Sequence, residues 1–176
     1  MTLIFIIVII CVIMIWYISV FNNYQNYIIR INEAEANIDS TLRKRFDLLN
    51  KSIGVIKSNT KEELVLEELA GLKNQKLTNF ELDRKIYIAI NEVNTLKEQH
   101  KDLKKCEGFL KIELSINETE AEIVASRKYY NDIITDYNKL TRTFPTNIVG
   151  KLCKFKSKAY FDGKNMEDKK INDFKL

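Results

Sequence analysis

The sequence LIFIIVIICVIMIWYISVF, at residues 3–21, contains no charged residue, no glycine and no proline. A helix rises about 1.5 Å per residue, so this stretch nearly matches the hydrocarbon core of a bilayer, which is about 30 Å thick. Trp16 and Tyr17 lie near its C-terminal end, and such amphipathic rings favour the headgroup level of a membrane. The stretch therefore predicts a transmembrane anchor whose partner is the lipid bilayer.

Two other interpretations of residues 3–21 fit less well. A cleaved signal peptide needs a positively charged start, a shorter apolar core and a small-residue cleavage site. Here Met1 and Thr2 lead straight into the apolar run, and no Ala-x-Ala sequence follows it. A buried core helix would need protein around every face of the stretch. We therefore expect an uncleaved, single-pass anchor.

The remaining composition favours long helices. The chain of 176 residues has only five glycines and one proline, and 30% of its residues are charged. About 155 residues remain after the anchor, which is enough for one domain with its own core. We expect an anchor at residues 1–21, a helical bundle at residues 22–161 and a disordered polar tail at residues 162–176.

Apolar residues recur at helical spacing in four segments. Between residues 24 and 57 the steps are three, four or seven, which predicts one helix of about 50 Å, either continuous with the anchor or broken briefly at Asn22 and Asn23. A second helix begins at a capping box formed by Thr60 and Glu63 and has a weakly patterned middle at residues 73–79. After a turn capped by Asp102, a third helix ends before Pro145, and residues 148–161 form a short basic amphipathic helix.

The expected fold class is therefore all-α, with an N-terminal transmembrane helix and an antiparallel long-helix bundle of three long helices plus a short fourth. If the three long helices alternate in direction, Phe144 lies about 50 Å from the bilayer. The fourth helix would then cap the distal end of the bundle, whereas a reversal of the chain within residues 73–79 would place it beside the lipid. The apolar residues expected to make this cap are Ile148, Val149, Leu152 and Phe155.

Six polar residues lie within or beside the apolar lines of these helices. They are Asp39, Arg45, Glu120, Arg127, Asn131 and Asn138. They can be hydrated at the edges of the helix contacts, or they can form a buried network that fixes helix register. Buried charge is costly unless it is paired, and both signs are present in equal number. We expect the buried network, with a structural rather than a catalytic role.

The sequence contains little support for catalysis, metal binding or nucleic-acid binding. The cysteines Cys11, Cys106 and Cys153 are far apart in sequence, which argues against a disulfide framework or a zinc site and favours a reducing compartment. His100 is the only histidine, and we expect it and Cys106 to be surface residues rather than a base and a nucleophile. We expect no cofactor and no metal. The net charge of +4 calls for no nucleic-acid partner.

Two blocks resemble the LemA family of bacterial membrane proteins. The first is ANIDSTLRKRFDLL, at residues 36–49. The second is KDLKKCEGFLKIELSINETEAEIVASRKYYNDIITDYNKLTRTFPTNIVG, at residues 101–150. The order and spacing of family positions agree across both blocks, and the similarity extends over residues 24–161. The resemblance implies a single-pass membrane protein with a bundle of about four helices and no established catalytic activity.

These features suggest a scaffold or interaction module at the bacterial inner membrane, with an unidentified protein partner. The N-terminal flank of the anchor has no Lys or Arg, whereas Arg30 and residues 43–45 follow it, so we expect a cytoplasmic domain. One alternative is a lipid-binding or membrane-remodelling protein, suggested by the basic helix. Another is an accessory subunit of a membrane-linked enzyme, or a hydrolase, which would need a concave polar pocket.

Overall fold

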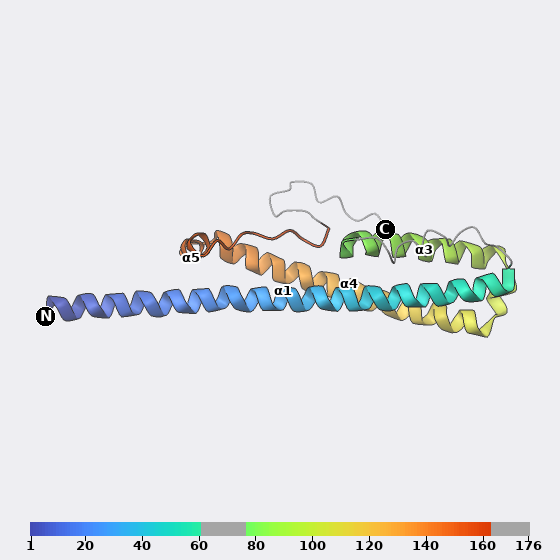
Figure 1. The fold of residues 1–176 in the computed structure, drawn as a ribbon, viewed down its shortest axis with the longest axis horizontal. Helices are drawn as coiled ribbons and strands as arrows, with labels where there is room; N and C mark the ends of the chain where they lie inside the picture. Colours follow the sequence, from blue (N-terminus) through green and yellow to red (C-terminus); the bar gives the residue numbers. More distant parts are fainter. Residues whose placement is uncertain (61–76, 163–176) are drawn as a thin grey trace. The chain divides into compact units, whose positions relative to one another are not determined.

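The computed structural model describes residues 1–60 and 77–162, and this part of the chain contains helices and no strand (Figure 1). The expected all-α fold class is confirmed. The α-helices and the one 3-10 helix of these residues are α1 (Thr2–Thr60), α3 (Asn79–Gln99), η1 (Leu103–Lys105), α4 (Glu107–Arg142) and α5 (Thr146–Leu152).

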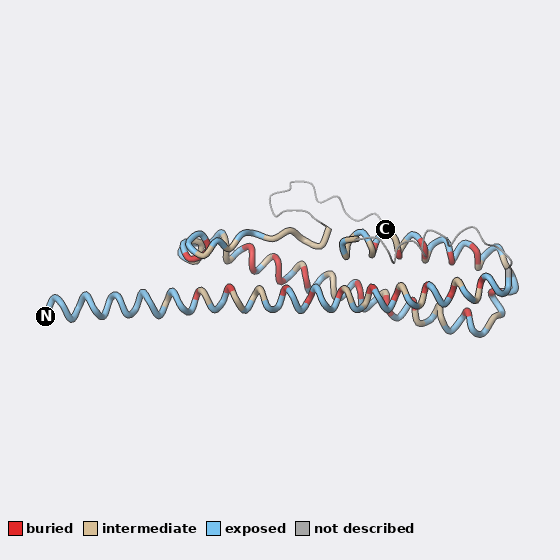
Figure 2. The backbone as a smooth tube through the Cα atoms, viewed as in Figure 1, coloured by how far each residue is buried: buried red, intermediate tan, exposed pale blue. Residues whose placement is uncertain are grey.

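Helix α1 is continuous over 59 residues. It is not interrupted at Asn22 and Asn23, because neither a proline nor a helix-capping turn occurs there. Within the described residues, α1 is the helix that is long and apolar enough to cross a membrane. Figure 2 shows that its N-terminal part is exposed along its length. The apolar side chains of residues 3–15 therefore have no protein core to cover them.

Burial along α1 begins at Val20 and Tyr24 and then follows one stripe of the helix. The spacing of three, four or seven residues agrees with the stripe that the sequence predicted. Ile28 and Ile53, also placed on that stripe, are only half-buried. The buried positions beyond Tyr24 are Ile31, Ala34, Ile38, Leu42, Arg45, Leu49, Ser52 and Ile56.

Helix α3 begins at a capping box. The Thr78 hydroxyl accepts a hydrogen bond from the Glu81 backbone N–H at 3.2 Å, and the Thr78 N–H donates to Glu81 Oε2 at 2.9 Å. The Thr78 N–H and the Thr78 hydroxyl, which both donate to Glu81 Oε2, hold the pKa of the Glu81 carboxyl below its usual range. Thr60 is the last residue of α1, and its expected capping partner Glu63 lies outside the described residues, as does the apolar line at Val65, Leu69 and Leu72.

The turn between α3 and α4 occurs where the sequence predicted it, but Asp102 does not cap α4. Asp102 precedes η1, and its side chain makes no capping hydrogen bond. The turn is closed by backbone bonds instead, such as Lys105 N–H to the Asp102 carbonyl at 3.2 Å. Leu103 is fully buried in this turn, so the packing of its side chain helps to hold the turn in place.

The chain divides into two compact units. Unit 1 combines Met1–Glu35 with Lys128–Leu176, and unit 2 is Ala36–Arg127. In unit 2, Leu49 and Ile56 of α1 pack with Val93 and Leu96 near the end of α3 and with Phe109 at the start of α4. Lys44, earlier in α1, pairs with Glu122, later in α4. Within unit 2, α3 therefore runs in the same direction as α1, and α4 runs in the opposite direction.

Unit 1 is formed by the first part of α1, the second part of α4, α5 and the residues after α5. The fourth helix is shorter than expected, because α5 ends at Leu152 and not near residue 161. Lys154 adopts a positive φ of 60°, which turns the chain out of the helix. Residues 155–160 then continue without regular secondary structure.

The expected position of α5 is wrong. Its Gly150 lies against Tyr24, where an added Cβ would be 2.6 Å from the tyrosine hydroxyl. The Phe21 and Phe155 rings are 5.9 Å apart. The segment after Pro145 therefore packs beside the end of the apolar stretch and does not cap the distant end. The reason is the direction of α3, since α4 then returns towards the beginning of α1.

Candidate functional site

The six polar residues predicted as one network separate into two clusters and one isolated residue. Arg45, Glu120 and Arg127 belong to a charged cluster in unit 2. Asn131 and Asn138 form a neutral cluster in unit 1. Asp39 belongs to neither, because it pairs with exposed Arg43 one turn away, at 2.8 Å, on the surface of α1.

The charged cluster is arranged around Arg45, whose side chain is only 2% exposed. Its Nη2 lies 2.5 Å from Glu120 Oε2, and Glu120 is 41% exposed. Arg127 approaches the other oxygen of Glu120 at 3.9 Å. Glu120 therefore bridges two arginines at the edge of the core, where water still reaches the carboxylate.

Asp83 of α3 completes this cluster, and it was missed from the sequence. Asp83 Oδ2 lies 3.4 Å from Arg127 Nη1, and both side chains are mostly buried. Burial raises the pKa of the Asp83 carboxyl above its usual range, although Arg127 and Arg45 act in the opposite direction. In the described part of the chain, Nε and Nη1 of Arg45 have no hydrogen-bond partner. The cluster thus joins α1, α3 and α4 but leaves polar hydrogens of Arg45 unsatisfied.

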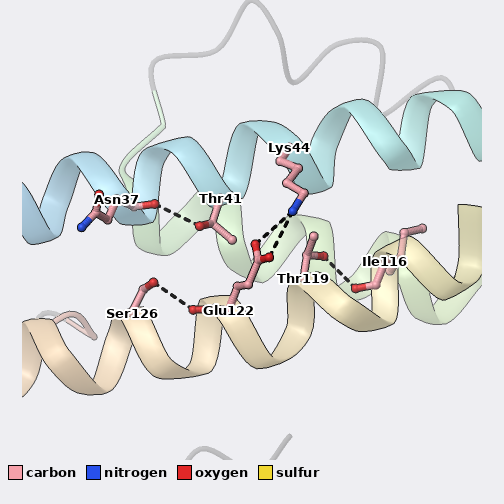
Figure 3. A network of polar contacts seen from close by, with 7 residues as sticks. All are labelled: Asn37, Thr41, Lys44, Ile116, Thr119, Glu122 and Ser126. Atoms are coloured by element: carbon pink, nitrogen blue, oxygen red, sulfur yellow. Dashed lines mark hydrogen bonds and ion pairs between the residues drawn. The ribbon is translucent and has the colours of Figure 1, made fainter.

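A second ion pair joins α1 to α4 at the surface. Figure 3 shows Lys44 of α1 reaching both carboxylate oxygens of Glu122 on α4, at 3.1 and 3.2 Å. Both side chains are about half exposed, so the pair contributes less than about 1 kcal/mol. In the same view Thr119 and Ser126 donate hydrogen bonds to carbonyls of their own helix. The Lys44–Glu122 pair therefore joins two helices, whereas the two hydroxyl bonds stay within α4.

In unit 1, two asparagines of α4 hold the chain that follows α5. The Asn138 amide donates to the Lys158 carbonyl and accepts from the Lys158 N–H, both at 2.8 Å. Asn131 Oδ1 accepts from the Phe161 N–H at 2.9 Å. The side chains of a helix thus bind backbone groups that a neighbouring strand would bind in a sheet.

The spacing of these contacts has a simple geometric reason. Asn131 and Asn138 are seven residues apart in a helix, which is about 10.5 Å along its axis. Lys158 and Phe161 are three residues apart in an extended chain, which is about 10 Å. The two distances match, so two asparagines that are seven residues apart on α4 can bind backbone groups that are three residues apart in the segment. The segment runs in the direction opposite to α4. The paired Tyr-Asn sequences at residues 130–131 and 137–138 provide this repeat.

Tyr24 forms the centre of unit 1 and has no exposed surface. Its hydroxyl lies 2.9 Å from the Leu140 carbonyl and 3.2 Å from the Thr146 carbonyl, the two backbone groups on either side of the turn at Pro145. Its ring stacks on Phe155 with centroids 4.5 Å apart. Burial raises the pKa of the Tyr24 phenol. One side chain of α1 thereby fixes the end of α4, the start of α5 and the chain just after it.

Tyr130 connects α4 to Glu35 on α1. The phenol donates to Glu35 Oε1 at 3.3 Å, and burial together with the nearby carboxylate raises the pKa of Tyr130 to about 12. Glu35 is exposed, which explains how a charged residue is accepted beside the apolar stripe of α1. The neighbouring hydroxyl of Thr135 lies 3.2 Å from that of Tyr160 and adds a contact to the segment after α5.

Both clusters are suited to a structural role, because their ion pairs and hydrogen bonds join separate elements of the chain. Cys106 packs partly against the core of unit 2, contrary to the surface position expected for it. Within residues 1–60 and 77–162, no group of three or more His, Cys, Asp and Glu side chains is placed to hold a metal ion.

Comparison with known families identifies a match over most of the chain. The model of the LemA family matches residues 34–173, which include both sequence blocks, the charged cluster and the two asparagines. The chain therefore belongs to the LemA family. A comparison with curated proteins finds no match.

Proposed function

We propose that this LemA-family protein is a single-pass protein of the bacterial cell membrane whose helices serve as a scaffold for a protein partner. The observation that carries the proposal is helix α1, which joins an exposed apolar segment to a buried stripe without a break. A continuous helix cannot bend freely between the two. The anchor would therefore hold unit 1 in a fixed orientation at the membrane surface.

The scaffold role is supported by the contacts that the polar side chains of the helices make. Arg45, Glu120, Arg127 and Asp83 pair with one another, and Asn131 and Asn138 bind backbone. Such contacts specify how helices and segments pack, and they need no substrate. We therefore propose a protein without catalytic activity.

A partner surface is suggested by apolar residues left exposed on α4 in unit 2. Leu114 and Val124 are exposed although both are large and apolar, and Leu110 is partly so. With Ala121 between them in sequence, they fall on one side of the helix. Exposed apolar side chains gathered on one face favour protein contact.

Membrane insertion is tested by washing membranes that contain the full-length chain with alkaline carbonate. We expect the chain to stay in the pellet, and intact mass measurement should show that the N-terminal residues are retained. Release by carbonate would contradict the anchor, and loss of residues 1–21 would identify a cleaved signal peptide. Labelling of Cys106 with an impermeant thiol reagent in intact cells would contradict the cytoplasmic orientation that the sequence predicts.

The partner surface is tested by cross-linking in membranes. We expect Leu114→Lys together with Val124→Glu to remove cross-linked species that the unaltered chain forms, without changing its thermal unfolding. Ile88→Glu, at an exposed position on α3, is the matched control and should leave the cross-links in place. Equal cross-linking by all three chains would contradict a partner at this face of α4.

A further inference from the structure

The turn before α5 and α5 itself expose three large apolar side chains. Phe144, Ile148 and Leu152 are 76%, 44% and 70% exposed. Ile148 and Leu152 are four residues apart, so they lie on the same face of α5. Val149 and Gly150, on the other face, are buried against unit 1. The exposed face is therefore not a loosely packed part of the core, because the core contact of α5 is already made.

The position of α5 in unit 1 places this face beside the end of the apolar stretch. The Tyr17 hydroxyl lies 3.1 Å from Cys153 Sγ, directly after α5. Phe21 packs on Phe155, and Tyr24 contacts Gly150. Residues 17–24 of α1 are thus the neighbours of α5. These are the residues at which a membrane-spanning α1 would leave the hydrocarbon core.

The charge around α5 has one sign. Residues 137–161 contain no Asp or Glu, and their basic residues are Lys139, Arg142, Lys151, Lys154, Lys156 and Lys158. Lys151, Lys154 and Lys156 are exposed. Lysines near an anionic bilayer surface are attracted to its headgroups electrostatically. Apolar side chains flanked by lysines are typical of segments that lie in the membrane interface.

We propose that Phe144, Ile148 and Leu152 insert into the interface of the same membrane that α1 spans, with the neighbouring lysines on anionic lipid headgroups. The proposal rests on the anchoring of α1 proposed above. The occupant is lipid because the exposed face continues the apolar surface of α1 and carries positive charge. This second contact fixes unit 1 against the bilayer and limits its rotation about α1.

Depth-dependent fluorescence quenching tests the contact, because Trp16 is the only tryptophan. The full-length chain is placed in vesicles of phosphatidylcholine and phosphatidylglycerol that carry lipids brominated on the upper acyl chain. In a Trp16→Phe background, Leu152→Trp introduces the reporter at α5, and Phe144→Trp provides a second one. Tyr129→Trp is the control in the same unit, since Tyr129 is exposed on α4 about 16 Å along the helix from Leu140.

We expect brominated lipid to quench the reporters at positions 152 and 144 at least threefold more than the control at position 129, and to quench Trp16 in the unaltered chain. Quenching of Trp16 with none at positions 144 and 152 would overturn the second contact and leave the anchor intact. No quenching of Trp16 would contradict the anchor itself. Blue-shifted emission of the Leu152→Trp chain without quenching would identify a protein surface in place of lipid and would also overturn the proposal.

A charge comparison tests the role of the lysines. In the Leu152→Trp chain, Lys151→Gln with Lys154→Gln should reduce the quenching in anionic vesicles and leave it unchanged in pure phosphatidylcholine. Equal quenching with and without these two substitutions in anionic vesicles would contradict the headgroup contact. Circular dichroism melting of each variant confirms that a loss of quenching does not come from unfolding.

Discussion

Units 1 and 2 bury polar side chains in different ways. Unit 2 places charges between its helices, and Glu120 remains partly in water while Arg45 is enclosed. Unit 1 uses neutral amides, and Asn138 is fully buried with both polar atoms bonded to Lys158. A charge at the core edge can use solvent to complete its interactions, whereas a neutral amide can be enclosed only where the geometry satisfies it fully. The two units should therefore respond differently when a single polar group is removed.

Asn138→Ala should have the largest effect on stability. It removes two hydrogen bonds, leaves the Lys158 backbone groups without their partners and creates a cavity. Since a buried unsatisfied polar group costs about 1–3 kcal/mol, we expect a loss of about 3 kcal/mol in the free energy of unfolding. Denaturant unfolding of the full-length chain in detergent measures it. Asn117→Ala, at an exposed position on α4, is the control and should change stability by less than about 0.5 kcal/mol.

Glu120→Gln should have a smaller effect, because Glu120 is partly solvated. Breaking a fully buried pair costs about 3–5 kcal/mol, and breaking an exposed pair costs less than about 1 kcal/mol. With Arg45 enclosed and Glu120 at the surface, we expect a loss of about 2 kcal/mol in the free energy of unfolding. Glu122→Gln, which breaks the exposed pair with Lys44, is the matched control. A Glu120→Gln effect no larger than that of Glu122→Gln would show that Arg45 needs no charged partner.

Gly150→Ala tests how closely α5 packs on Tyr24. The new Cβ would lie 2.6 Å from the tyrosine hydroxyl, so ring or helix must move, and overpacking costs about 1–3 kcal/mol. We expect a lower melting temperature and a loss of about 1.5 kcal/mol in the free energy of unfolding. At Gly54, within α1, a Cβ meets no atom within 4 Å, so Gly54→Ala should instead stabilise by about 0.5–1 kcal/mol. A stabilising effect of both substitutions would contradict the packing described for α5.

Asp83→Asn tests the charged cluster through pH and should give the smallest change. The pKa of Asp83 is raised in the folded protein, so between the ordinary value and the raised one the folded state binds more protons than the unfolded state. This contribution to stability is present below the ordinary pKa and is lost as pH rises through the raised value. The stability of the unaltered chain minus that of Asp83→Asn should therefore fall as pH increases through this window. A rise of that difference with pH would mean that Arg127 lowers the pKa of Asp83 by more than burial raises it.

The sequence predicted α1 well, because its apolar period is a local property of the helix. Arg45 was placed on the stripe by its position between Leu42 and Leu49, and the structure encloses it. Asp83 was missed although it lies three residues before Ile86, on the buried side of α3. The spacing of three residues was present in the sequence, but only the contacts with Arg127 and Arg45 show that this carboxylate is enclosed.

The segment after α5 could not be placed from its own residues. Phe155, Ser157 and Ala159 alternate with lysines, which is the period of an extended chain, but the apolar spacing at residues 148–155 also fits a helix. The choice depends on Asn131 and Asn138, which belong to a different element. The direction of α3 could not be predicted from its own residues either, because only contacts between helices determine it.

Hydrogen exchange of the Lys158 and Phe161 amides tests most directly the claim that two asparagines of α4 hold the chain that follows α5. Both amides bond to an asparagine oxygen, at 2.8 and 2.9 Å. In the full-length chain they should exchange at least about a hundredfold more slowly than in an unstructured peptide. In Asn138→Ala, Lys158 should lose this protection while α4 keeps its own. Exchange of both amides at the peptide rate in the unaltered chain would contradict this role of the asparagines.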